Sequence, residues 1–239
     1  MARIKNALFS IYFGDQSTAY LKNSLHNYTQ QEMMVLPGYK EFCLQNRCEN
    51  IIILDQVHGN NGFCVREKKD VLLKPYTVRG DYIVSALPKI ALAVETADCA
   101  PVVLIDVIGG VVSLAHAGWR GALAGVVTHA VGDMLKVGSL IENIQIYFGP
   151  AARSCCYQVS RDFLDLFEQS DPNIYFQERN GAAYFDNTLF IAWQLEKLGM
   201  ARKNILLDYA ICTICSEKYC SFRRQGQIAL RQMTIVALK

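Results

Sequence analysis

This chain of 239 residues lacks a long apolar run. Its most hydrophobic segment, residues 102–118, contains Asp106 and His116, whereas a membrane-spanning helix needs about 20 consecutive apolar residues. The N-terminus is basic and then apolar, but it reaches Asp15 without a recognisable signal-peptide cleavage site. These absences argue against a membrane protein and predict a cytoplasmic location.

Excess charge, linkers and repeats are also lacking. The 24 basic and 22 acidic residues give a net charge of +2, so long-range attraction to a polyanion is weak. Two short basic runs, residues 66–70 and the segment around Arg223, are interpreted as solvated turns, and no nucleic-acid partner is expected. Without a Pro-, Gly- or Ser-rich linker, residues 1–239 are predicted to form a single domain. Hydrophobic residues make up 51% of the chain, enough for a sizeable core.

The nine cysteines are odd in number and show no compact disulfide spacing. Most are therefore expected to be reduced core thiols. Cys212 and Cys215 form a CxxC pair that, with Cys220, could act as a redox or zinc-binding hook. This reading is disfavoured because the sequence shows no second CxxC or histidine pair to complete four ligands.

Six segments rich in β-branched residues and bounded by turn formers predict strands. They span residues 50–57, 81–88, 89–96, 100–107, 109–117 and 143–150. Helical periodicity predicts helices over 122–138, over 161–169 after Ser160, and over 189–200 with Asn187 or Thr188 at the start. Because strands and helices do not alternate regularly, the pattern favours an α+β fold of mixed β-sheets with helices on the outside.

Cys99 and His116 stand at the outer ends of two apolar runs that meet at Gly109-Gly110. If the runs pair as a hairpin, both side chains lie at the same end, and His58 follows another predicted strand in QVHGN. A His, Cys, His set fits a catalytic zinc site that keeps one position open. The residues alone leave two alternatives: Cys99 as a nucleophile with His116 as its base, and simple packing.

Several further segments are specific enough to compare with known families: QVHG, TADCAPVVLID, AHAGWRGALAGV, FGPAARSCCYQV, YFDNTLFIAWQLEKLG and the C-terminal ICT, CSFRR and RQ. Together they resemble the YfiH/YlmD family, the purine nucleoside phosphorylases long labelled multicopper polyphenol oxidases or laccase-domain proteins. The segments run in order from about residue 50 to the end of the chain. The spacing of ADC and HAGWRG is the most specific of these signals.

The resemblance implies a single domain with α/β/β/α-type layers and a zinc ion held by His58, Cys99 and His116. It also implies a cytoplasmic enzyme that cleaves purine nucleosides with phosphate, with adenosine deamination as a further activity at the same site. Its oligomeric state is unknown. Copper-dependent phenol oxidation is the disfavoured alternative, because multicopper chemistry needs more than the four histidines present.

Phosphorolysis requires cationic or amide donors for phosphate. Arg79 and Arg120 are the candidates, the latter at a predicted helix N-terminus. Asp81 and Asp98 are the catalytic candidates, to orient ribose hydroxyls or a metal-binding imidazole. Trp119 is expected to be a packed aromatic residue.

The chain departs from the family pattern where phosphate binding is expected. An Asn-Arg pair is usual in the N-terminal part, but here Asn27 is followed by Tyr28. Asn46-Arg47 lies too close to QVHG to replace it, and Arg231 follows Leu230 where the family usually has glycine. A zinc-binding protein without phosphorolytic activity and a Cys99-His116 hydrolase therefore stay open as alternatives.

Overall fold

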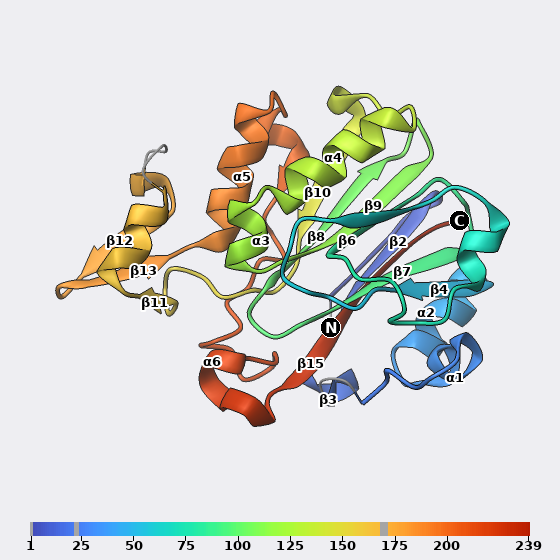
Figure 1. Cartoon of the computed structure of the whole chain (residues 1–239), viewed down its shortest axis with the longest axis horizontal. Helices are drawn as coiled ribbons and strands as arrows, with labels where there is room; N and C mark the ends of the chain where they lie inside the picture. Colours follow the sequence, from blue (N-terminus) through green and yellow to red (C-terminus); the bar gives the residue numbers. More distant parts are fainter. Residues whose placement is uncertain (1, 22–23, 168–171) are drawn as a thin grey trace.

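The computed structural model describes residues 2–21, 24–167 and 172–239 and contains two mixed β-sheets packed face to face (Figure 1). The first sheet has the order β1 (Ala2–Lys5), β2 (Phe9–Phe13), β15 (Leu230–Leu238), β7 (Ile90–Thr96) and β4 (Asn50–Ile53), with β3 (Tyr20–Leu21) paired to β15. The second has the order β14 (Ile205–Leu206), β10 (Ile144–Phe148), β8 (Ala100–Asp106), β9 (Val111–Ala117), β6 (Tyr82–Ser85) and β5 (Gly62–Val65).

Alternating side chains of the central strands supply the core on both faces of each sheet. Val103 and Ile105 of β8 point into the cluster between the sheets, whereas Val102 and Leu104 face the helices. All seven residues of β8 and of β9 are buried. A strand buried on both faces is a continuous apolar run, which is why these segments were readable in the sequence.

Helices cover the outer face of each sheet. On one side lie α1 (Gln30–Val35) and α2 (Tyr39–Asn46), packed on the first sheet through residues such as Met33 and Phe42. On the other lie α3 (Trp119–Leu123), α4 (Val126–Lys136) and α5 (Asn187–Lys197) (Figure 1). The layers are thus α/β/β/α, and the predicted α+β class of mixed sheets with outer helices is confirmed.

Smaller elements complete the fold. A third sheet has the order β11 (Gln158–Val159), β13 (Ala182–Phe185) and β12 (Phe176–Arg179), and α6 (Phe222–Gln225) precedes β15. Short 3-10 helices span Gln16–Thr18, Lys68–Leu72, Ile141–Asn143, Arg161–Phe167, Pro172–Ile174, Arg202–Asn204 and Gly226–Ile228. Among the described residues, every helix is too short or too polar to span a bilayer.

The structure contains every predicted strand, but its helices differ from the predicted ones in number, type and bounds. The helix expected over 122–138 is two helices, α3 and α4, because Gly125 adopts a left-handed conformation (φ +78°) between them. The segment 161–169 forms a 3-10 helix over Arg161–Phe167, and its last two residues lie outside the described residues. Asp186 caps α5 by accepting from the Leu189 amide (3.1 Å), one residue before the predicted start.

Candidate metal centre and active-site pocket

The β8–β9 hairpin brings Cys99 and His116 to one end, as predicted. The strands pair in antiparallel register with Pro101 opposite His116, and the tip is fixed by Asp106, which accepts from the amides of Ile108 (3.0 Å) and Gly109 (2.7 Å). His58 joins them from the loop after β4. The ligand atoms of His58, Cys99 and His116 all lie within 4.8 Å of one another.

Asp81, which directly precedes β6, contacts the His116 side chain and the backbone of the His58 loop. Its Oδ1 lies 2.8 Å from Nδ1 of His116, and its carboxylate also accepts from the backbone amides of His58 (2.9 Å) and Gly59 (2.7 Å). These bonds hold the His58 loop, where His58 itself has a positive φ of 60°. A carboxylate on one ring nitrogen of a histidine fixes its orientation and leaves Nε2 for a ligand.

The donor set and its surroundings fit a metal ion. A Cβ atom at Gly118 would lie 2.9 Å from Cδ2 of His58 and 3.1 Å from Sγ of Cys99, so only glycine leaves this space free. His116 is buried, Cys99 is partly buried and His58 is exposed. Three N and S donors open to solvent on one side are the arrangement of a catalytic site.

Cys99 and His116 perturb each other strongly. Burial raises the pKa of the Cys99 thiol, but the charge of His116 and hydrogen bonds from His116 and His58 together lower it to about 6. Burial lowers the pKa of His116, but Cys99 and the hydrogen bond with Asp81 raise it to about 9. A thiolate beside an imidazolium serves either as a metal ligand or as a nucleophile.

A cavity of about 590 Å³ opens onto these three residues, a volume suited to a small organic substrate. Three guanidinium groups line it. Arg120 lies over the Trp119 ring (4.2 Å to the centroid), Arg223 lies over Tyr157 (4.6 Å), and Arg231 comes from the start of β15. The pocket therefore combines positive charge with aromatic faces beside the N and S donors.

Glu95 on β7 is a carboxyl group in the wall of this cavity. Its Oε1 accepts from the Tyr76 hydroxyl (3.0 Å), and its backbone is held by two 2.8 Å bonds with the Gln56 side chain. Burial raises the pKa of Glu95 to about 7, only partly offset by the Tyr76 hydrogen bond and the charge of Arg231. A carboxyl group of this kind can hold or release a proton near neutral pH.

The other predicted site residues have different surroundings. Arg120 and Asp98 line the cavity, whereas Arg79 does not; the side chain of Arg79 is 77% exposed and lies 3.9 Å from Asp55. Both carboxylate oxygens of Asp98 are engaged, with the Thr213 hydroxyl (2.6 Å) and the Arg223 amide (2.7 Å). Asp98 has a positive φ of 82° and ties two C-terminal loops to the rim of the pocket.

Sequence reasoning missed Glu95, His26 and Tyr157 as pocket residues. His26 stacks on Tyr76 (4.3 Å between ring centroids) from a segment far from the recognisable motifs. Glu95 directly precedes TADC, and a charged residue inside an apolar strand is the one signal that could have identified it. The basic segment interpreted as a solvated turn instead supplies Arg223 to the pocket.

Comparison with known proteins agrees with this geometry. Residues 23–239 match the family described as multi-copper polyphenol oxidoreductase laccase, and the chain belongs to this family. It is 31% identical over 193 residues to a purine nucleoside phosphorylase of Borreliella burgdorferi (73% of this chain, 82% of the relative). It is 33% identical over 176 residues to a purine nucleoside phosphorylase of Mycobacterium bovis (74% and 68%).

The fold is also found in a solved structure. The crystal structure of the Bacillus licheniformis hypothetical protein YfiH superposes with a TM-score of 0.77 at 22% sequence identity. The superposition covers 97% of this chain and 93% of that chain. The expected YfiH/YlmD resemblance is confirmed, and with it the expected fold.

Proposed function

We propose that this protein is a zinc-dependent purine nucleoside phosphorylase that cleaves adenosine-, inosine- or guanosine-type nucleosides with phosphate. The observation that carries the proposal is the joint location of His58, Cys99 and His116 beside a cavity lined by three arginines. The names of the relatives support the same reaction. A cytoplasmic location is part of the proposal and agrees with the nine cysteines, all of which are free thiols.

We assign zinc rather than copper to this donor set. Two imidazoles and one thiolate also hold copper in electron-transfer sites, but those usually add an axial methionine, and no methionine is among the described residues that line this cavity. A zinc ion there would act as a Lewis acid toward the substrate. Asp81 orients His116 and holds the His58 loop, so we assign it a positioning role. The two other histidines are outside this ligand group: His26 lines the cavity but stacks on Tyr76, and Nδ1 of His129 on α4 lies 3.2 Å from the Asn60 carbonyl.

In phosphorolysis a phosphate oxygen forms a bond to ribose C1′ while the bond from C1′ to the purine breaks. The bonding electron pair leaves with the purine, which takes up a proton. Arg120, Arg223 and Arg231 present positive charge for the phosphate, and Glu95 is our candidate proton donor. The Tyr157 and Trp119 rings offer apolar faces for a base.

The sequence predicts phosphate binding for both Arg79 and Arg120, but the structure places the two side chains in different surroundings. Arg120 lines the cavity, whereas Arg79 extends to solvent beside Asp55. Asp98 holds the rim through Thr213 and Arg223, so we assign it a positioning role for the phosphate-binding wall.

The test is to incubate zinc-loaded protein with inosine, adenosine or guanosine, with and without phosphate. The proposal expects free purine base and ribose 1-phosphate in equal amounts, only with phosphate. Conversion of adenosine to inosine without phosphate would instead show deamination at this site. If base, ribose 1-phosphate and inosine are all absent from a folded, zinc-loaded protein, the family member has lost its phosphorylase activity.

Two further alternatives have their own readouts. The low pKa of Cys99 is also what a Cys99-His116 hydrolase requires, and alkylation of Cys99 in protein purified without metal would support it. The family description includes copper oxidases, so oxygen uptake with a phenol by copper-loaded protein tests that reading. If the site at His58, Cys99 and His116 retains one zinc ion that Cys99→Ser loses, the result supports the phosphorylase proposal against both the hydrolase and the copper oxidase.

A further inference from the structure

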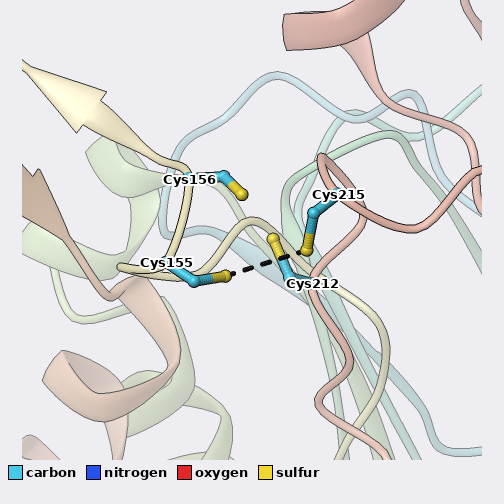
Figure 2. A group of neighbouring side chains, drawn as sticks. All are labelled: Cys155, Cys156, Cys212 and Cys215. Atoms are coloured by element: carbon cyan, nitrogen blue, oxygen red, sulfur yellow. Dashed lines mark hydrogen bonds between the residues drawn. The ribbon is translucent and has the colours of Figure 1, made fainter.

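A second group of metal-ligand atoms lies outside the pocket. The sulfur atoms of Cys155, Cys156, Cys212 and Cys215 are all within 4.8 Å of one another, and we call this group the four-cysteine cluster. Figure 2 shows one pair of side chains reaching from one chain segment toward the pair from another. The sequence alone showed only the Cys212-Cys215 half, and the fold supplies the two missing ligands.

Backbone pairing holds the two segments in register. The Ala151 amide donates to the Ile211 carbonyl (3.0 Å), and the Thr213 amide donates to the Ala151 carbonyl (3.0 Å). A tight turn follows, in which the amides of Cys156 (3.0 Å) and Tyr157 (2.8 Å) both donate to the Arg153 carbonyl. The cluster is therefore built on fixed backbone rather than on free loop ends.

We propose that the four-cysteine cluster binds one zinc ion as a structural site, distinct from the site at His58, Cys99 and His116. Four sulfurs about 2.3 Å from one zinc ion lie about 3.8 Å apart in a tetrahedron. The Cys155 and Cys215 sulfurs are 3.9 Å apart, and Cys155 also contacts Cys156 and Cys212. A disulfide would join only two of the four, at about 2.05 Å.

The surroundings suit a thiolate cluster. The backbone amides of Arg153, Ile214 and Cys215 donate to the Cys212 sulfur, an arrangement that stabilises negative charge on sulfur. Four thiolates and one Zn²⁺ carry a net charge of −2 after the thiol protons are released. Two guanidinium groups brace the same loops: Arg179 donates to the Cys155 carbonyl (3.0 Å) and Arg224 to the carbonyls of residues 213, 214 and 216.

The position of the cluster indicates its role. Cys156 directly precedes Tyr157 of the pocket wall, and Thr213, between the two CxxC cysteines, holds Asp98 (2.6 Å). Cys212 is buried, whereas Cys155 and Cys215 are exposed, so an ion can enter from the surface. With four cysteine ligands, the zinc ion would have no free coordination position for a substrate. It would instead link two segments that lie about sixty residues apart in the chain.

The first test counts metal per chain in protein purified under reducing conditions and loaded with zinc alone. Wild type is expected to hold two zinc ions, and Cys99→Ser and Cys215→Ser one each. The double variant is expected to hold none, while the control Cys64→Ser, whose thiol faces Asp133 (3.4 Å), keeps both. If wild type holds one ion that Cys99→Ser removes, or if Cys215→Ser keeps two, the proposal is wrong.

A second measurement leaves the cluster unmutated. X-ray absorption at the zinc edge of Cys99→Ser is expected to show four sulfur neighbours at about 2.3 Å and no nitrogen. A mixed nitrogen and sulfur shell would overturn the proposal. So would a disulfide between two of the four cluster cysteines, located by peptide mapping of unreduced, metal-free protein. Neither measurement uses a nucleoside, so the result does not depend on the proposed enzymatic activity.

Discussion

The two thiol-containing sites differ in whether they would leave a coordination position of a bound metal ion open. The site at His58, Cys99 and His116 has three donors and faces a cavity of about 590 Å³. The four-cysteine cluster has four donors, and its members are absent from the lining of that cavity. Three ligands leave room for chemistry and four fill the coordination sphere. If zinc occupies both sites as we propose, it would serve catalysis at the first and structure at the second.

The largest expected effect is a double dissociation between the sites. Cys99→Ser is expected to reduce phosphorolysis to background and to lower the melting temperature less than Cys212→Ser, because three protein ligands hold zinc less tightly than four and the stabilisation follows RT ln(1 + [L]/Kd). Cys212→Ser is expected to lower the free energy of unfolding by about 4 kcal/mol at free zinc a thousandfold above the Kd. Activity assays and thermal melts of both variants check this, with Cys64→Ser as the control. Equal effects of both variants on both readouts would erase the distinction.

The buried carboxyl group of Glu95 in the pocket can be tested through the pH dependence of protein stability. Because burial raises its pKa from 4.5 to about 7, folded Glu95 keeps its proton over a range in which the unfolded chain has lost it. The stability that this provides is complete below pH 4.5 and is lost as the pH rises toward 7, by at most about 3 kcal/mol.

Glu95→Gln, which cannot ionise, is expected to remove this dependence. Relative to the variant, wild type should lose stability between pH 4.5 and 7 in urea unfolding experiments and change little above. Parallel pH profiles of wild type and Glu95→Gln would show that folding does not raise the pKa of Glu95.

Asp81 tests whether the open site depends on its supporting carboxylate. Asp81→Asn keeps the size of the side chain but removes the charge beside His116, and it disturbs the bonds to the His58 and Gly59 amides. Loss of such a partner typically reduces metal affinity or activity about 10- to 100-fold. Competition with a zinc chelator measures the affinity. An unchanged zinc affinity at the open site would show that Asp81 does not position the ligands.

The smallest effect separates two arginines that sequence reasoning treated alike. Arg120→Ala removes a charge from the cavity and is expected to raise the KM for phosphate about tenfold, because a hydrogen bond to a charged group contributes about 1.5 kcal/mol or more. Arg79→Ala removes a solvent-exposed charge and should change the KM less than twofold. The reverse order of effects would place phosphate near Arg79.

The sequence predicted the central strands well because strands such as β8 and β9 are buried on both faces and appear as uninterrupted apolar runs. It predicted Cys99 and His116 at one end because a Gly-Gly turn between two such runs favours a hairpin. It missed the break at Gly125, where a left-handed residue divides an otherwise periodic helix. It also missed the N-terminal helices α1 and α2, of which α2 carries little amphipathic patterning.

The site residues that the sequence did not predict share one cause. Arg223 reaches the pocket because its amide donates to Asp98, a residue 125 positions earlier in the chain. The four-cysteine cluster forms because the pair of residues 151 and 212 brings together segments sixty residues apart. Such long-range pairings depend on the packed fold rather than on local spacing, so a CxxC read by itself lacked half of its ligands.

The most direct measurement of the central claim follows inosine and phosphate with zinc-loaded wild type and Cys99→Ser side by side. Wild type is expected to release hypoxanthine and ribose 1-phosphate in equal amounts only when phosphate is present, while Cys99→Ser, folded and with zinc at the four-cysteine cluster, releases neither. Equal product formation by both proteins, or none by zinc-loaded wild type with any purine nucleoside, would contradict the account.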